Sequence, residues 1–413
     1  MADSVPVTRS FDIDAIRAQF PILSREVNGK PLVYLDSAAS AQKPEAVIEA
    51  MASQARTAYA NVHRGLHTLA NETTEAFEGA REDARRFLNA ASSDEIVFTK
   101  GATEAINLAA SGLALQLEPG DEVLLSVMEH HSNIVPWHFL RERRGVVLRW
   151  IEVDQAGDLD MESFRSQLSP RTKVVALTHM SNVLGTVPDV ATVIAEAHAA
   201  GAQVLLDGCQ AAVHLDVDVQ ALDVDFYVFS GHKIYGPTGI GVLYGKAARL
   251  EALQPWQGGG EMIETVTRDV VTYNAPPHRF EAGTPPILEA VGLSAAIRWI
   301  EGVDRAHGAA HKQAVVERMT AGLTGINGLT VHGRSDRKGP VLTFSIARLH
   351  PHDVAQIMDR YGVAIRAGHH CAQPLMAHLG VSTTARASVA LYNTLEEADV
   401  FVAALDKART MLS

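Results

Sequence analysis

Residues 225–233 read Asp225-Phe226-Tyr227-Val228-Phe229-Ser230-Gly231-His232-Lys233. The apolar run in this stretch predicts a buried β-strand, and polar residues follow that strand at once. Between residues 95 and 245 such runs alternate with helical stretches: strands are expected at 96–98, 122–127, 146–153, 173–178, 203–206 and 226–229, and helices at 103–115, 133–143, 161–168 and 190–200. This alternation predicts an α/β fold with a mixed, mainly parallel sheet between helices. Ligands of such sheets bind beyond the carboxyl ends of the strands.

Gly- and Pro-rich stretches at 257–261 and 275–286 separate this block from the C-terminal part. That part is expected to hold a helical region from 287 to about 323, strands at 341–346, 363–365 and 387–391, and a final helix at 395–411. We predict a large ligand-binding domain at 29–295 and a smaller α+β domain at 296–413. Residues 1–28, with a helix at 14–19, are expected to pack on the smaller domain.

Composition narrows the class of protein. The 36 basic and 48 acidic residues of this 413-residue chain give a net charge of −12, which argues against nucleic acid or an anionic membrane as the main partner. Neither a signal peptide nor a spanning apolar segment is evident. The two cysteines cannot form a disulfide framework, so we expect a globular protein of the reducing cytoplasm.

Lys233 and Asp207 each follow a predicted strand. A lysine at a buried strand end is costly unless it is paired or used chemically, and desolvation suits it to forming a Schiff base. An aspartate at the neighbouring strand end is what pyridoxal phosphate requires, because a carboxylate keeps the pyridinium nitrogen protonated. A solvent-reaching lysine, or a structural ion pair of the two residues, is the alternative.

A phosphate site is expected near the start of the predicted helix at 103–115. Gly101, Ala102 and Thr103 follow a strand and open this helix, whose first N–H groups suit an anion; a simple helix cap explains them equally well. Ser230 and His232, on a neighbouring strand end, are expected to complete the phosphate shell. His130 is expected to stack on the ring and to transfer protons, with a structural histidine as the alternative.

Cys371 lies in the turn Arg366-Ala367-Gly368-His369-His370-Cys371-Ala372. Cations and backbone N–H groups favour a thiolate there, and a loop leaves the thiol accessible. We therefore interpret Cys371 as a reactive thiol. Its alternative is a small buried apolar side chain, which is the common state of a free cysteine.

Taken together, the motifs resemble the class V, fold-type I pyridoxal-phosphate enzymes, and among them the group II cysteine desulfurases of the SufS/CsdA kind. The resemblance spans nearly the whole chain. The matching motifs are Tyr34-Leu35-Asp36-Ser37-Ala38-Ala39, Asn61 to His67, Gly101 to Asn107, Glu129 to Asn133, Asp207-Gly208-Cys209-Gln210, Ser230 to Gly239, Phe280 to Pro285, Arg366 to Cys371 and Arg386-Ala387-Ser388.

This resemblance implies roles for individual residues. Lys233 is implied to bind pyridoxal 5'-phosphate covalently, Asp207 and Gln210 to contact its ring nitrogen and phenolate oxygen, and His130 to stack on it. Ala102, Thr103, Ser230 and His232 would bind its phosphate, and Thr284 would approach the phosphate of a neighbouring subunit in a homodimer. Asn182 and Arg386 would hold the substrate carboxylate. His63 and Arg366 would line the entrance.

The implied reaction converts L-cysteine to L-alanine and leaves a persulfide on Cys371. The sulfur would then pass to a SufE-like or SufU-like acceptor protein and on to iron–sulfur cluster assembly. Selenocysteine lyase, with L-selenocysteine as substrate, is the alternative within the same apparatus, and a transaminase or kynureninase-like enzyme is an alternative on the same fold. A cofactor-free thiol hydrolase using Cys371 and His370, or a non-catalytic sulfur carrier, is a further alternative.

Two details of the pattern need separate interpretation. Cys209 stands where the family often has alanine, and we interpret it as a packing residue rather than a second reactive thiol. His63 and His67 have the i, i+4 spacing of metal ligands, but residue 64 is arginine rather than the glutamate of a metalloprotease motif. We therefore expect no metal.

Overall fold

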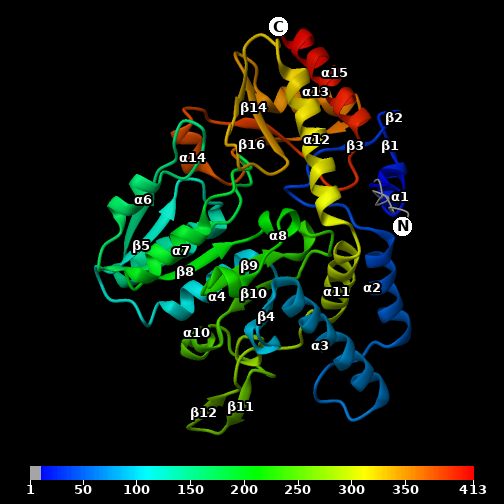
Figure 1. Cartoon of the computed structure of the whole chain (residues 1–413). Coiled ribbons are helices and arrows are strands. Elements are labelled where there is room, and N and C mark those ends of the chain that lie inside the picture. Colours follow the sequence, from blue (N-terminus) through cyan, green and yellow to red (C-terminus); the bar gives the residue numbers. More distant parts are fainter. Residues whose placement is uncertain (1–10) are drawn as a thin grey trace, which may run out of the picture.

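A seven-stranded sheet runs through the larger part of the molecule (Figure 1) in the computed structural model, which describes residues 11–413. The strands lie in the order β4 (Ile96–Thr99), β10 (Gly241–Gly245), β9 (Phe226–Ser230), β8 (Gln203–Asp207), β7 (Thr172–Thr178), β5 (Glu122–Ser126) and β6 (Val147–Ile151). Neighbours from β9 to β6 pair in parallel, whereas β10 is antiparallel to both β4 and β9. The predicted mixed, mainly parallel sheet is confirmed.

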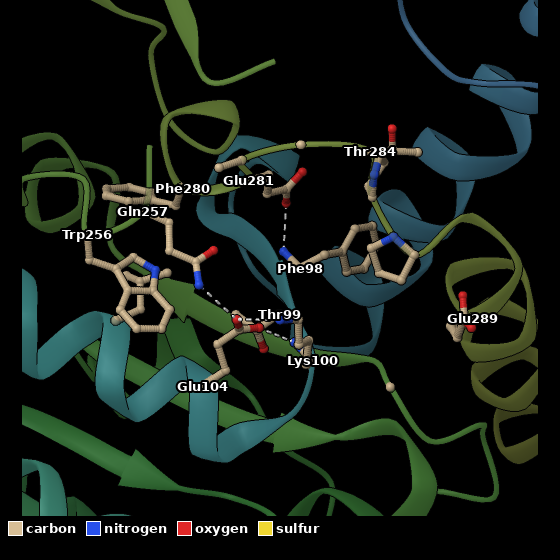
Figure 2. A pocket seen from close by; sticks show the side chains of 16 residues that line it. Phe98, Thr99, Lys100, Glu104, Trp256, Gln257, Phe280, Glu281, Thr284 and Glu289 are labelled. Atoms are coloured by element: carbon tan, nitrogen blue, oxygen red, sulfur yellow. Dashed lines mark hydrogen bonds and ion pairs between the residues drawn. The ribbon is translucent and has the colours of Figure 1, made fainter. Parts of the chain in front are cut away.

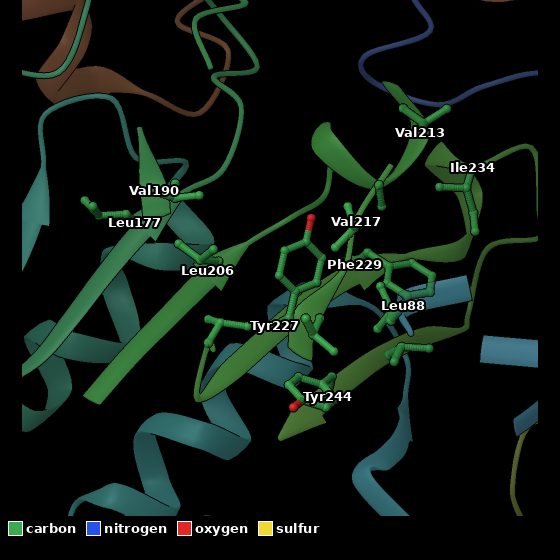
Figure 3. Close-up of a cluster of buried hydrophobic side chains, with 14 of the residues drawn as sticks. Leu88, Leu177, Val190, Leu206, Val213, Val217, Tyr227, Phe229, Ile234 and Tyr244 are labelled. Carbon is green, nitrogen blue, oxygen red and sulfur yellow. The ribbon is translucent and has the colours of Figure 1, made fainter. Parts of the chain in front are cut away.

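Alternation along each strand divides the core into two layers. In β9, Tyr227 and Phe229 join one apolar cluster, while Phe226 and Val228 join the other. The first cluster takes side chains from α3 (Thr68–Leu88), α6 (Met161–Gln167) and α7 (Val190–Ala199), and Figure 3 shows part of it. The second takes side chains from α4 (Ala102–Leu113) and α5 (Val135–Arg144). Both faces of the sheet are thus covered by helices, which is why its strands are apolar without alternation.

Two regions of helix differ from the sequence-based expectation. Helices α2 (Glu45–Thr57) and α3 were not predicted, and both pack against α11 (Ile287–Glu301). The helical region expected at 287–323 is confirmed, but it consists of two helices, because the chain breaks after α11 and restarts as α12 (Arg305–Leu323). Asp304 caps the second helix, since its side chain accepts a hydrogen bond from the His307 N–H.

A smaller antiparallel sheet lies in the C-terminal part, in the order β13 (Leu329–His332), β14 (Val341–Ile346), β17 (Thr384–Ser388) and β16 (Arg366–Gly368). Side chains of α12, α13 (Pro351–Arg360) and α15 (Leu395–Leu412) form one core with this sheet. The strand expected at 387–391 was placed three residues too late.

The N-terminal part contacts this C-terminal unit. Strand β3 (Val33–Tyr34) pairs in parallel with β15 (Val363–Ala364). Arg17, which ends α1 (Ile13–Arg17), donates a hydrogen bond to the Tyr392 carbonyl at 2.8 Å and forms an ion pair with Glu397 at 2.7 Å. The helix expected at 14–19 is thus displaced by one to two residues. Residues 1–10 of the predicted segment 1–28 lie outside the described residues, and the domain boundaries at 28 and 295 stay predictions.

Short elements complete the chain. They are η1 (Pro21–Ser24), β1 (Glu26–Val27), β2 (Lys30–Pro31), η2 (Ser93–Glu95), η3 (His131–Asn133), α8 (Ala211–His214), α9 (Val219–Leu222), η4 (Gly231–Lys233), α10 (Ala247–Ala252), β11 (Ile263–Val266), β12 (Val271–Tyr273), η5 (His278–Phe280) and α14 (Gln373–His378). In residues 11–413, no helix has both the length and the apolar character that crossing a membrane requires.

Candidate active site

A cavity of about 320 Å³ lies at the carboxyl ends of the parallel strands; we call it the Lys233 cavity. Eleven residues singled out from the sequence line it: Ala102, Thr103, His130, Asn182, Asp207, Ser230, His232, Lys233, Arg366, Cys371 and Arg386. They come from strand ends of the large sheet and, for the last three, from the C-terminal unit. The predicted amine and the predicted thiol therefore line one cavity.

The start of α4 forms one wall of this cavity. The Ala102 N–H donates to the Ser230 Oγ at 2.9 Å, which ties the helix to the end of β9. Gly101 precedes the helix with φ of 152°, and a Cβ on Gly241 of β10 would lie 2.5 Å from the Gly101 Cα. Only glycine allows the strand and the helix start to approach so closely. The helix N-terminus and the Ser230 hydroxyl together make a wall suited to an anion.

Asp207 ends β8 and is 5 % exposed. One of its carboxylate oxygens accepts a hydrogen bond from the Cys209 N–H at 3.0 Å. The Cys209 Sγ lies 3.7 Å from the Ser230 Oγ, and burial, followed by the charge of Asp207, raises the pKa of this thiol to about 12. Cys209 is therefore a thiol rather than a thiolate near neutral pH, which agrees with its interpretation as a packing residue.

His130 is held in one protonation state. The Ser132 N–H donates to its Nδ1 at 3.1 Å, so the proton of the neutral ring lies on Nε2. Burial, followed by the Lys233 charge, lowers the pKa of His130 to about 4. Behind this residue, the Glu129 carboxyl accepts hydrogen bonds from the Ser126 hydroxyl and the Thr178 N–H, and burial raises its pKa to about 8.

The opposite wall is basic. Arg386 is 2 % exposed; it donates to the Asn182 carbonyl at 2.9 Å and to the Asp36 carboxylate at 3.2 Å. Its Nε is buried and has no hydrogen-bond partner among residues 11–413. Arg366 forms a two-nitrogen contact with the same Asp36 carboxylate, at 2.9 and 3.0 Å. A buried guanidinium with an unused donor is suited to a carboxylate ligand.

The loop that carries Cys371 joins β16 to α14 and is anchored on both sides. The His131 N–H donates to the Cys371 carbonyl at 2.7 Å, and the Asn182 amide donates to the His370 carbonyl at 2.9 Å. His370 and Cys371 have φ of 51° and 55°, a conformation that costs non-glycine residues about 1 kcal/mol or more. The thiol is half-buried and free.

The surroundings of Cys371 bear on two alternatives, a hydrolase that uses Cys371 with His370 and a metal site that includes this thiol. The His370 ring bonds to the Thr384 hydroxyl at 2.9 Å, and no hydrogen bond to the Cys371 sulfur is found in the described part of the chain. This disfavours a Cys371–His370 hydrolase. Ring nitrogens of His131 and His369 and the Cys371 sulfur lie within 4.8 Å of one another. However, His131 Nε2 and His369 Nδ1 already accept hydrogen bonds from backbone N–H groups, at 3.2 and 3.1 Å. This disfavours their use as metal ligands.

Three residues singled out from the sequence do not line the Lys233 cavity. Gln210 is buried beside it and donates its amide to the Ala38 carbonyl at 2.8 Å. The His63 ring contacts Glu78 at 2.8 Å. Thr284 lines a different cavity of about 400 Å³ (Figure 2), together with Glu104, which directly follows Thr103 in α4. The first turn of α4 thus separates the two cavities.

Other residues of the site were not singled out as site residues. Six of them also line the Lys233 cavity: Ala38, Ala39, Ser40, Ser132, Cys209 and His370. Asp36 forms ion pairs with both arginines of this cavity, Arg366 and Arg386. Asp36 follows β3, a strand of only two residues that pairs with a strand 330 residues later. A two-residue strand gives no periodicity signal, so only the motif resemblance pointed to this segment.

Comparisons with known proteins agree with this geometry. A family model described as aminotransferase class-V matches residues 33–401. Cysteine desulfurases of Pectobacterium atrosepticum and Klebsiella pneumoniae are each 49 % identical to the chain over 98 % of its length, and 99 % and 100 % of those proteins are covered. The crystal structure of the cysteine desulfurase CsdA from Escherichia coli superposes with a TM-score of 0.92 at 42 % identity, over 98 % of this chain and 100 % of that one. The cysteine desulfurase from Thermococcus onnurineus superposes with a TM-score of 0.91 at 36 % identity, over 99 % and 100 %.

Proposed function

Because the chain belongs to the aminotransferase class-V family and, within it, to the cysteine desulfurases, we propose that the Lys233 cavity is its active site. In the overall reaction the C–S bond of L-cysteine breaks and the released sulfur bonds to the Cys371 sulfur, which forms a persulfide. The β-carbon of the substrate gains a proton, which gives alanine. The observation that carries this assignment is that Lys233, Asp207 and Cys371 line one cavity.

The polar groups of the cavity fit pyridoxal phosphate, on which the family depends. The half-buried Lys233 amine has no hydrogen-bond partner in residues 11–413 and would bind the aldehyde. The buried Asp207 carboxylate would pair with the ring nitrogen, and the start of α4 with Thr103, Ser230 and His232 would hold the phosphate. When bound, this cofactor supplies an electron sink for the substrate carbanion.

Other residues of the chain would act on the cofactor, the substrate and the proton. His130 would stack on the ring, and its neutral imidazole would relay the proton. Gln210 is proposed to face the phenolate oxygen from its buried position beside the cavity. Arg386, with its unused Nε, and Asn182 would hold the substrate carboxylate, which would place the sulfur toward Cys371. His63 and Arg366 are proposed for the entrance.

The persulfide sulfur on Cys371 has to be transferred to an acceptor before the next turnover. We propose a SufE-like or SufU-like acceptor protein that takes sulfur from Cys371 for iron–sulfur cluster assembly. The half-buried position of this thiol on a loop supports transfer to an outside acceptor.

The test of the assignment is incubation of the purified protein with L-cysteine and no keto-acid acceptor. Alanine should form, and reduction with borohydride should fix pyridoxal phosphate on Lys233. Alanine formation that requires a keto acid would identify a transaminase instead. The Cys371→Ser variant tests the role of the thiol, because it should lose cysteine cleavage and keep selenocysteine cleavage, which depends less on the thiol. A wild-type protein that cleaves L-selenocysteine but not L-cysteine would be a selenocysteine lyase instead.

A homodimer that shares its sites is also proposed, with Thr284 reaching the phosphate of the other subunit. Mixed dimers of Lys233→Ala and Thr284→Ala subunits test it. If Thr284 acts across the dimer, one site carries both changes and the other is intact, so the mixture regains activity and cofactor affinity. If Thr284 serves its own subunit, both sites of the mixed dimer stay impaired.

A further inference from the structure

Glu129 is a fully buried acidic residue that stands directly before His130 in the chain. One of its carboxyl oxygens accepts hydrogen bonds from the Ser126 hydroxyl at 2.6 Å and from the Thr178 N–H at 3.0 Å. The other oxygen accepts a hydrogen bond from the Asn133 side-chain amide at 2.6 Å. Acidic side chains are rarely buried unless they are paired, and this one joins donors from three segments of the chain.

These hydrogen bonds tie a short turn to the carboxyl ends of two strands. Ser126 and Thr178 are the last residues of β5 and β7, which pair with each other in the large sheet. Asn133 is the last residue of η3, the turn that follows His130, and its N–H donates to the His130 carbonyl at 2.8 Å. The Glu129 side chain therefore fixes the turn that carries His130 to the sheet.

The same turn contacts the loop that carries the reactive thiol. The His131 N–H donates to the Cys371 carbonyl at 2.7 Å, and the His131 Nε2 accepts a hydrogen bond from the Gln373 N–H at 3.2 Å. A shift of this turn would therefore move the His130 ring and the Cys371 loop together.

We infer that Glu129 is a positioning residue, which holds His130 and the Cys371 loop in place relative to the large sheet. Glu129 does not itself line the Lys233 cavity, so it acts through the residues that do. The inference rests on the proposed function, because that function gives His130 and Cys371 their roles.

An exchange of the carboxyl group of Glu129 and the amide of Asn133 tests this inference. In Glu129→Gln, the new amide nitrogen cannot accept a hydrogen bond, so it would place a donor against either the Thr178 N–H or the Asn133 amide. The Asn133 amide is not free to turn round, because its oxygen accepts a hydrogen bond from the Trp137 Nε1–H at 3.2 Å. Adding Asn133→Asp supplies acceptors for both the new amide and Trp137. The double variant should therefore restore the turn that Glu129→Gln disturbs.

Two measurements on the full-length protein report on the turn without the reaction. Titration of the cofactor-free protein with pyridoxal phosphate reports on the His130 ring, and the rate at which iodoacetamide alkylates Cys371 in the holoenzyme reports on the loop. Glu129→Gln should weaken cofactor binding about tenfold and change the alkylation rate about threefold or more, because buried hydrogen bonds are lost. The double variant should return both values to within about twofold of the wild type. The value of kcat/KM for L-cysteine should follow the same order.

Glu122→Gln is the matched control. Glu122 is also buried, begins β5 at the opposite end of that strand, and accepts hydrogen bonds from the Ser169 hydroxyl at 2.6 Å and from Arg149 at 3.0 Å. This variant should lower thermal stability and leave cofactor affinity and Cys371 alkylation unchanged.

Three results would overturn the inference: unchanged cofactor affinity and alkylation in Glu129→Gln, an equal loss in Glu122→Gln, or no recovery in the double variant. If Glu129→Gln does not fold, Asn133→Ala decides in the same way, since it removes the link between the Glu129 carboxyl group and the turn. A wild-type protein that binds the cofactor but forms no alanine from L-cysteine would refute the proposed function instead, and the two measurements would still decide the role of Glu129.

Discussion

Arg386 is the most constrained charged residue of the site, because it is buried and shares Asp36 with Arg366. We expect Arg386→Lys to lower kcat/KM for L-cysteine by about 10- to 100-fold, mainly through KM, because an ammonium cannot reproduce the planar guanidinium contact. Steady-state kinetics measure this. Arg366→Lys is the control, since its side chain is 50 % exposed and should change KM less. Equal effects of the two changes would contradict the assignment of the carboxylate to Arg386.

The ionisation of His130 gives a second prediction at this scale. Since burial lowers its pKa to about 4, the ring is neutral at every pH above about 5. The pH profile of kcat/KM should therefore contain no acid limb near 6.5 that belongs to His130. An acid limb near 6.5 that disappears in His130→Gln would contradict this expectation.

Several residues singled out from the sequence lie where a strand ends. Lys233, Asp207 and Ser230 each follow an apolar run directly, so the parallel sheet brings them together. Asp36 was not predicted as a site residue, because its role comes from contacts with two arginines at least 330 residues away. Local sequence carries no signal for such a contact.

At the scale of elements, β10 and α4 fix the anion wall of the cavity. We expect Gly241→Ala to destabilise the fold by about 1–3 kcal/mol and to weaken pyridoxal phosphate binding, because the new Cβ would lie 2.5 Å from the Gly101 Cα. Thermal unfolding and cofactor titration measure the two effects. Gly79→Ala is the control, because no atom lies within 4 Å of the Cβ that it would add. This change within α3 should raise the free energy of unfolding by about 0.5–1 kcal/mol. Normal cofactor affinity in Gly241→Ala would contradict the role of this contact.

Elements with strong periodic patterns were predicted, and those defined by packing were not. The parallel strands β5 to β9 are mostly apolar runs of five to seven residues. By contrast, β10 begins and ends at a glycine and follows β9 without an intervening α-helix, so the sequence carried no signal for its antiparallel direction. The break between α11 and α12 rests on a cap at Asp304 that was overlooked within a helical stretch.

At the scale of the whole molecule, buried histidines make stability depend on pH. Burial lowers the pKa of His179 to about 4 and that of His370 to about 3, below the ordinary value of 6.5. Between pH 6.5 and 4 the unfolded chain binds more protons at these groups, so the free energy of unfolding should fall as the solution is acidified. Glu129, with its pKa raised to about 8, acts oppositely between pH 8 and 4.5. It is a single group, whereas burial also lowers the pKa values of His130 and His232 to about 4.

Denaturant unfolding at pH 7 and pH 5 measures this dependence. Replacing His179 by Gln should reduce the difference in unfolding free energy between the two pH values. A wild-type protein that is more stable at pH 5 than at pH 7 would contradict the burial of these histidines as neutral rings.

One cavity is lined by both Lys233 and Cys371, the proposed sulfur acceptor. The most direct measurement is peptide mass spectrometry after a single turnover with L-cysteine, combined with quantification of alanine. One additional sulfur atom should be found on Cys371 for each alanine formed, none on Cys209, and neither product in Cys371→Ser. Sulfur on Cys209, or alanine formed at the full rate by Cys371→Ser, would contradict the role of Cys371 as the sulfur acceptor.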